Sequence, residues 1–230
     1  MTRKILRTLC GGVLFMLAAC AVQPEKPEVV EIPFDPAAKG APTHVVDSAN
    51  SSARIRVYRA GAISGLGHNH IVLARDIRGE AWLGTEPAAA AFHLVLPVAA
   101  FVVDPPDLRA QAGPDFASKP SLEDVNGTRN NMLGERVLNA AQYPELEIWS
   151  ERIRGSGDEL TADVVVSARG QLSRVSVPVV INTSASATVA QGSFSLRQTD
   201  IGITPFSILM GAIAVRDELE IEYNLSLDIK

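Results

Sequence analysis

The sequence of 230 residues is poor in several residue types on which large classes of function depend. Aromatic residues make up only 5%, which argues against a surface that stacks nucleic-acid bases. The 26 acidic residues outnumber the 21 basic ones and give a net charge of −5, whereas a nucleic-acid binder needs a basic face. The two cysteines, at positions 10 and 20, exclude a cysteine zinc site, and no glycine-rich phosphate loop is present.

Hydrophobic residues, in contrast, make up 47% of the chain and charged residues 20%. This balance is typical of a chain that buries a core and not of a disordered one. The length fits one domain of ordinary size or two small ones. The composition therefore indicates a globular protein and argues against nucleic acid as its partner.

The first nineteen residues have the pattern of a secretory signal. Arg3, Lys4 and Arg7 form a positive start, and the apolar run Leu9–Ala19 follows. This run is too short for a permanent membrane-spanning helix, which needs about 20 apolar residues. We therefore expect residues 1–19 to be a signal peptide.

The end of the signal, Leu17–Cys20, resembles the bacterial lipobox. In that motif the cysteine becomes the lipidated N-terminus, so Cys20 is the expected membrane anchor. The alternative is an ordinary signal peptide with an incidental cysteine. Because Ala21, and not aspartate, follows the cysteine, the usual sorting pattern predicts an outer-membrane lipoprotein of the bacterial envelope that faces the periplasm.

Residues 20–43 contain five prolines interleaved with charged residues. Proline at this density blocks helix and strand pairing and favours extended chain, so we expect a tether between membrane and domain. An ordered arm around Ile32–Phe34 is the alternative. The remaining residues, 44–230, are the expected folded domain.

Most of this domain alternates apolar and polar residues with a period of two. This pattern is typical of antiparallel strands that have one wet face. Glycine-rich and Asn-Thr turns separate the segments, as at 155–158 and 182–183. The apolar faces so predicted are Ile71, Leu73, Ile77, Ala81 and Leu83; Phe92, Leu94 and Leu96; Leu146 and Ile148; Leu160, Ala162, Val164, Val166 and Ala168; Val175, Val177, Val179 and Ile181; and Leu219, Ile221, Tyr223, Leu225, Leu227 and Ile229.

One segment, near 121–141, has helical spacing instead. Ser121 and Asp124 form the pattern of a capped helix start, and apolar residues follow three to four positions apart. We expect the helix to end near Ala141, and Gly127 is a point where it would split.

About eight or nine one-sided strands need closure or a covering layer to bury their apolar faces. The sequence therefore predicts an all-β fold, a closed antiparallel barrel of about eight strands with a helical insert. Barrels of eight strands can enclose a small ligand. A β-sandwich with a filled core is the alternative.

Five segments carry a resemblance to a known family, in order along residues 44–230: Arg129–Ile148, Leu160–Val164, Ala168–Val175, Leu196–Ile203 and Val215–Leu219. They resemble the YceI-like family of bacterial periplasmic proteins. The resemblance implies a lipocalin-like barrel with an apolar lumen that binds a long isoprenoid or quinone-type lipid without catalysis, and it implies no required cofactor. The glycine- and histidine-rich stretch from Gly61 to Ile71 departs from the family pattern.

His68 and His70 are candidate metal ligands, because residues i and i+2 of a strand point to one side. Either His93 or His44 would have to supply a third ligand. If Ile71 and Leu73 face the lumen, both histidines face away from it, unless Gly65 and Gly67 bulge the strand. A polar turn without metal is the alternative.

Other residues are candidates for contact with a lipid. Arg129, on the predicted helix, is placed to meet a polar head group at a barrel mouth. Flexible or apolar side chains in segments that need not all be core are candidates to line the lumen. They are Met132, Leu133, Phe206, Leu209 and Met210.

Two other functions remain open from the sequence: a metal-binding protein or metal enzyme built on the histidine pair, and a ligand-free interaction module of the envelope. A homodimer is a further expectation for the assembly. Asp104 and Asp107, with Asp115, are candidates for the paired carboxylates of an acid–base catalyst. The two prolines between Asp104 and Asp107 instead predict a solvated loop. We therefore expect no catalytic residues.

Overall fold

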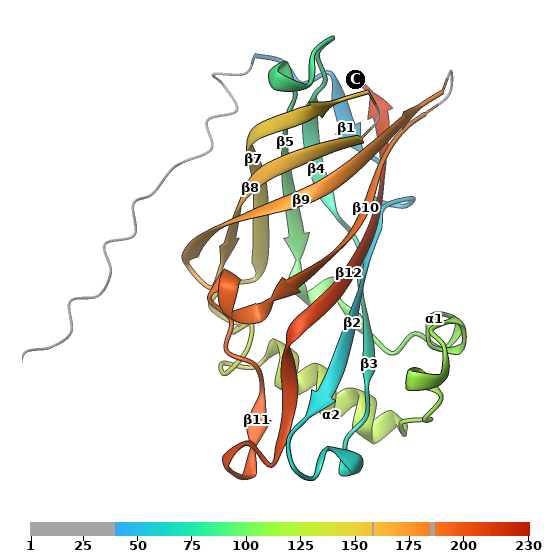
Figure 1. Cartoon of the computed structure of the whole chain (residues 1–230), viewed down its shortest axis with the longest axis vertical. Helices are drawn as coiled ribbons and strands as arrows, with labels where there is room; N and C mark the ends of the chain where they lie inside the picture. Colours follow the sequence, from blue (N-terminus) through green and yellow to red (C-terminus); the bar gives the residue numbers. More distant parts are fainter. Residues whose placement is uncertain (1–39, 158, 185–186) are drawn as a thin grey trace, which may run out of the picture. The chain divides into compact units, whose positions relative to one another are not determined.

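The computed structural model describes residues 40–157, 159–184 and 187–230. The expected signal peptide, the Cys20 anchor and all but the last residues of the expected tether lie outside the described residues. Figure 1 shows a tall barrel of strands with helices near its lower end. The strands are β1 (His44–Val46), β2 (Ser52–Ala60), β3 (His70–Ala74), β4 (Arg78–Trp82), β5 (Ala91–Pro97), β6 (Val102–Val103), β7 (Glu145–Ser156), β8 (Glu159–Ala168), β9 (Gln171–Thr183), β10 (Thr188–Arg197), β11 (Ser207–Ile208) and β12 (Ile213–Ile229).

The helices are α1 (Pro106–Gln111) and α2 (Leu122–Leu133), and short 3-10 turns lie between the strands. In the described part of the chain, no helix has both the length and the apolar character needed to cross a membrane.

Eight strands form a closed antiparallel ring in the order β1–β4–β5–β7–β8–β9–β10–β12. The ring closes where β12 pairs with β1, with His44 opposite Ile229 and Val46 opposite Leu227. Below β1, the long β12 pairs with β2, and β3 and β6 continue this part of the wall. The predicted eight-stranded barrel is therefore confirmed, and the sandwich alternative is wrong.

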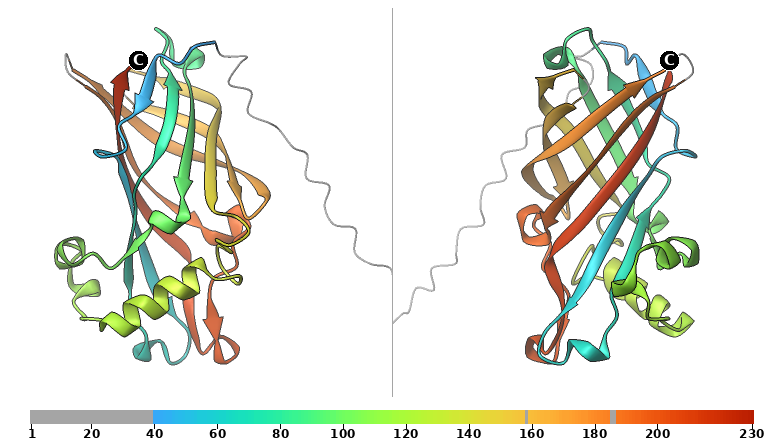
Figure 2. Two further views of the ribbon diagram at one scale, coloured as in Figure 1. Left: turned by 180° about the vertical axis from the view of Figure 1, so that it is seen from behind. Right: turned by 45° about the vertical axis from the view of Figure 1, so that its right-hand side comes forward.

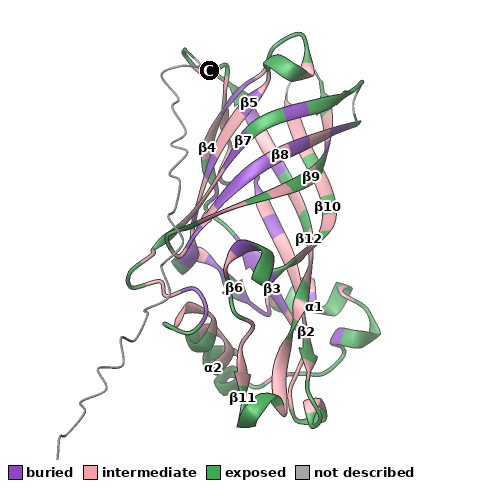
Figure 3. Ribbon diagram, turned by 60° about the vertical axis from the view of Figure 1, so that its left-hand side comes forward, coloured by how far each residue is buried: buried purple, intermediate pink, exposed green. Residues whose placement is uncertain are grey.

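The predicted alternation accounts for most of the wall. The apolar residues of β5, β8, β9 and β12 face the inside of the barrel, and their charged neighbours face outward. Buried residues are concentrated on strands such as β3 and β8, while the helices near the lower end are largely exposed (Figure 3). Each inward-facing side chain is thus removed from water by strands that pair on both sides.

The predicted face from Ile71 to Leu83 is wrong in its first part. His70, Val72 and Ala74 face the inside of the barrel, while Ile71 is buried on the outer face of β3, near α1. The alternation changes phase at Asp76, whose φ of 55° lies in the left-handed region and breaks the strand into β3 and β4. Because β3 is buried on both faces, its sequence does not show which face points inward.

The capped helix is confirmed, but it ends earlier than predicted. Ser121 Oγ accepts a hydrogen bond from the Asp124 N–H, and the Asp124 carboxylate accepts one from the Ser121 N–H. The helix continues through Gly127 and ends at Leu133, where Gly134 has an extended backbone. It lies across the lower end of the barrel (Figure 2) and packs near β6.

Candidate ligand-binding site

The barrel encloses a cavity of about 770 Å³, lined mainly by apolar side chains. This volume lies within the range of about 300–1,000 Å³ that is usual for small-molecule sites. Every strand of the closed ring contributes to its wall. One lining residue from each strand, in ring order, is Val46, Ala81, Leu94, Ile148, Val164, Val177, Phe194 and Leu225.

The cavity opens at the lower end of the barrel, which we call the mouth. The exposed residues of its lining gather there, on the end of β2, the turn η2 (Ser64–Leu66), α2 and β11. Most of the polar lining lies at the same end: the cavity-facing side of α2 presents Asp124, Thr128 and Asn131 at intervals of three to four residues. A ligand in the cavity would therefore meet apolar side chains along the barrel and polar groups at the mouth.

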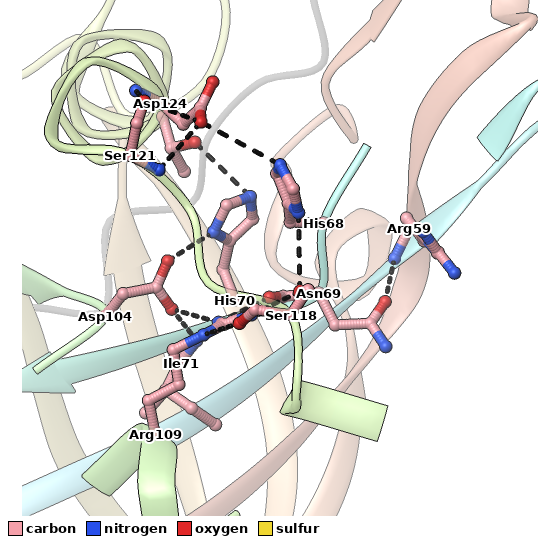
Figure 4. A network of polar contacts seen from close by, with 11 residues as sticks. Arg59, His68, Asn69, His70, Ile71, Asp104, Arg109, Ser118, Ser121 and Asp124 are labelled. Atoms are coloured by element: carbon pink, nitrogen blue, oxygen red, sulfur yellow. Dashed lines mark hydrogen bonds and ion pairs between the residues drawn. The ribbon is translucent and has the colours of Figure 1, made fainter. Parts of the chain in front are cut away.

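A buried ion-pair network joins His70, at the mouth, to Asp104 and Arg109 (Figure 4). His70 Nδ1 lies 2.7 Å from Asp104 Oδ2. Asp104 Oδ1 accepts hydrogen bonds from the Ile71 N–H, at 2.9 Å, and from Arg109 Nη1, at 2.7 Å. The side chains of Asp104 and Arg109 are only 2% and 9% exposed. Arg109 also donates to the Asn69 carbonyl and to Ser118, which fastens the α1 region to β3.

The carboxyl of Asp104 is ionised in this network. Burial by itself raises its pKa, but the hydrogen bonds from His70 and the Ile71 N–H, with the charges of His70 and Arg109, hold the pKa below its usual range. An ionised carboxylate only accepts hydrogen bonds, so Nδ1 of His70 carries the proton. The prediction that Asp104 belongs to a solvated loop is wrong, because Arg109 and β3 bury it.

Both histidines line the cavity at the mouth, with ring centroids 6.2 Å apart. His70 Nε2 lies 3.3 Å from Thr128 Oγ1 on α2. His68 is held less closely, since its nearest charged partner, Asp124, is 4.0 Å away. The expectation that regular pairing turns them outward is wrong, because the inward face of β3 is the one that starts at His70.

Neither candidate third ligand joins this pair. His93 lies on β5 and contacts Glu147 at 3.0 Å, and His44 lies on β1 beside Thr43. Neither lines the cavity. Over the described ranges, no group of three or more His, Cys, Asp or Glu side chains is placed to hold a metal ion.

The predicted lipid contacts fall into two groups. Met132 and Phe206 line the cavity, whereas Leu133 packs against the core without reaching it. Leu209 and Met210 are exposed on the turn η7 (Leu209–Gly211), outside the cavity.

Arg129 lies on another face of α2 and donates to the Ala99 carbonyl at 2.9 Å, so it does not line the mouth. The residues that do, Asp124 and Thr128 above all, were not candidates from the sequence. The helical spacing of Asp124, Thr128 and Asn131 is the signal that could have found them.

The comparisons with known proteins agree with this architecture. The profile of the YceI-like domain matches residues 45–227. The fold is similar to that of BcnA from Burkholderia cenocepacia, with a TM-score of 0.59 and 15% identity over 79% of this chain and 98% of that chain. It is also similar to a mutant of the Campylobacter jejuni YceI protein, with a TM-score of 0.51 and 8% identity over 69% of this chain and 85% of that chain.

At these identities the structural likeness establishes the fold alone. No curated protein matches the sequence. The family profile, however, spans most of the chain, from the first strand of the barrel to the last. The chain therefore belongs to the YceI-like family.

Proposed function

We propose that this protein binds a long apolar lipid in the barrel cavity and carries it without chemical change. The observation that supports this most directly is the cavity of about 770 Å³ inside the barrel, with its apolar wall. Each Å² of apolar surface removed from water is worth about 25 cal/mol, so a long hydrocarbon chain can bind tightly through burial alone. The isoprenoid or quinone type of the lipid follows from the family resemblance and is part of the proposal.

The polar end of the lipid would lie at the mouth. His68, Thr128 and Asn131 offer both donors and acceptors there, and Asp104 fixes the ring of His70 beside them. An oxygen-bearing head group would replace its water contacts with these side chains. A small polar group on a long apolar chain therefore matches the distribution of polarity in the cavity.

The location of the protein belongs to the same proposal. A lipid on Cys20 would tether the barrel to the bacterial envelope, facing the periplasm, with the outer membrane as the expected site. A tethered carrier would remain close to the bilayers that supply and accept its lipid.

The first experiment is purification of residues 40–230, which contain the complete closed barrel and its core. The purified protein is extracted with organic solvent, and the extract is measured by mass spectrometry together with the metal content of the same sample. A stoichiometric isoprenoid or quinone supports the proposal. Stoichiometric metal without lipid would instead favour the histidine pair as a metal site, and neither one, even after reconstitution with lipid, would favour an interaction module.

A matched pair of variants tests the place of binding. Val177 lines the cavity, whereas Val180 lies on the outer face of the same strand. We expect Val177→Trp to fill part of the cavity and reduce the bound lipid at least tenfold, and Val180→Trp to leave it unchanged. Equal lipid content in the two variants would place the lipid elsewhere.

A further inference from the structure

Two loops project side by side from the lower end of the barrel (Figure 1). We call residues 61–69, with η2, and residues 204–212, with β11 and η7, the two tip loops. The Ile63 N–H donates to the Ala212 carbonyl at 3.0 Å. Gly61 passes so close to the same carbonyl that a Cβ there would lie 2.4 Å from its oxygen. The two loops therefore form one joint projection beside the cavity mouth.

This projection exposes apolar side chains to water. Leu66 is 74% exposed, Leu209 63%, and Met210 is fully exposed, while Ile63 and Ile208 are exposed to a smaller degree. Leu66 and Ile208 also line the cavity, so the exposed apolar surface continues into the binding site. Exposed apolar side chains gathered on one projection in this way mark an interaction surface.

The backbone of the second tip loop holds these side chains outward at a conformational cost. Leu209 and Met210 have φ angles of 50° and 55°, in the left-handed region that residues with side chains rarely adopt. Neither residue belongs to the barrel core or its packed neighbours. Packing within the described structure therefore does not explain why two apolar residues occupy this strained, exposed turn.

The distribution of charge identifies the kind of surface that fits. No Asp, Glu, Lys or Arg occurs in residues 60–74 or in residues 201–215. Arginines stand at the base of the projection: Arg59 pairs in register with Val215, Arg216 lies over the Tyr58 ring at 5.2 Å, and Arg136 donates to the Ser207 carbonyl of the second loop. The acidic residues of the mouth, Glu123 and Asp124, lie on α2 and not on the tips.

An uncharged apolar tip backed by arginines suits the interface of a bilayer. Apolar side chains enter the acyl region, while guanidinium groups remain at the level of anionic phosphates. We propose that the two tip loops dock the cavity mouth on an anionic phospholipid bilayer, so that a lipid can pass between the bilayer and the cavity. The docking surface stands on its own observations, and only the passage of lipid rests on the proposed function.

The length of chain before the barrel permits this orientation. The first strand begins at the end of the barrel opposite the tip loops (Figure 1). The twenty residues from Ala21 to Gly40 can span at most about 70 Å when fully extended. The longest strand, β12 with 17 residues, extends only about 56 Å. An anchor at Cys20 would therefore let the mouth reach the membrane that holds it.

The test uses residues 40–230, which lack the anchor, and flotation with vesicles. We expect binding to vesicles of phosphatidylglycerol and phosphatidylethanolamine, and much weaker binding to phosphatidylcholine. The double variant Leu209→Ser/Met210→Ser should lower the bound fraction at least tenfold. The matched control is Ile229→Ser, because Ile229 is 81% exposed but is the last residue of β12 and pairs with β1. This end of β12 lies at the opposite end of the barrel (Figure 1). The variant Arg59→Gln/Arg216→Gln should remove the preference for anionic vesicles.

The proposal is overturned if the wild-type protein does not bind anionic vesicles, or if the serine variant binds them as well as the wild type. Loss of self-association in that variant, without vesicle binding by either protein, would assign the patch to a second copy of the chain. The lipid content of each variant separates docking from cavity binding. Lipid retained by the serine variant supports docking as a distinct step, and vesicle binding by a protein with no cavity lipid would leave docking intact while the carrier function fails.

Discussion

At the scale of single residues, Asp104 is the one on which the mouth depends most. It is buried, ionised, and shared among His70, Arg109 and the Ile71 N–H. A buried charge is costly unless it is paired and hydrogen-bonded, and this one has partners on both carboxylate oxygens. The same contacts fix the ring of His70 at the edge of the cavity. Stability and the shape of the mouth are therefore linked through one carboxylate.

We expect Asp104→Asn to lower the free energy of unfolding by about 3 kcal/mol, because it leaves Arg109 as an unpaired buried charge. Asparagine tolerates the left-handed φ of 51° at this position, so the effect reports charge and not backbone strain. Urea unfolding at pH 7 measures it.

The pH dependence of the stability difference between the wild type and Asp104→Asn tests whether the ionised carboxylate causes it. The native pKa of Asp104 is lowered, so its stabilisation is fully present above about pH 4, the usual pKa of an aspartate, and is lost as the pH falls through the lower native value. The wild type and Asp104→Asn should therefore converge in stability in strong acid. Asp228→Asn, an exposed change on β12, should cost less than about 0.5 kcal/mol. A stability difference between the wild type and Asp104→Asn that stays constant from pH 7 into strong acid would contradict a stabilising role for the ionised carboxylate.

At the scale of elements, α2 differs from the strands around it. It has a complete capping box but no fully buried residue. Beyond the packing of its apolar side chains, it is held across the mouth by the contact of Thr128 with His70 and by the hydrogen bond from Arg129 to the Ala99 carbonyl. Elements with few buried contacts open first, and binding-site lids belong to this class. We therefore expect α2 to be the part of the mouth that opens most readily.

We expect Ser121→Ala to destabilise α2 by about 1 kcal/mol, because the Asp124 N–H loses its acceptor and the Asp124 carboxylate loses the Ser121 hydroxyl. Hydrogen exchange of residues 122–133 should become about fivefold faster, while exchange in β8 and β9 stays the same. Ser193→Ala, on an exposed position of β10, is the control. Faster exchange throughout the barrel would show instead that the cap supports the whole fold.

At the scale of the whole molecule, the barrel keeps an open cavity where most domains have a packed core. Protein interiors are normally close-packed, and side chains beside a void lose contacts that they would otherwise make. The ring of antiparallel pairs, closed between β1 and β12, holds the wall in place around this space. A ligand that fills the cavity restores the missing contacts.

On the proposed function, we expect removal of the lipid to lower the free energy of unfolding. With free ligand at 100 times its Kd, mass action predicts a loss of about 2.7 kcal/mol. Thermal unfolding of native, delipidated and reconstituted residues 40–230 measures this. Val180→Trp should show the same shift, whereas Val177→Trp should show little. Identical unfolding of native and delipidated protein would speak against a ligand in the cavity.

The elements whose signals are local could be predicted from the order of amino acids alone. The alternation of β12, β8 and β9 gives their inward faces directly, because neighbouring side chains of a strand point to opposite sides. The Ser121–Asp124 pattern likewise predicted the start of α2, since a capping box involves only residues within one turn. These patterns, with the family resemblance, were sufficient for the eight-stranded barrel.

The inward face of β3 and the residues of the mouth, in contrast, depend on how distant segments come together. β3 is apolar on both sides, so its pattern is equally consistent with either orientation. The network of His70 and Asp104 joins residues 34 positions apart. The exposure of Leu209 and Met210 is likewise absent from the sequence pattern, because hydrophobicity states what a side chain prefers and not what surrounds it. Those surroundings are set by contacts between distant segments, which exist only once the barrel has closed.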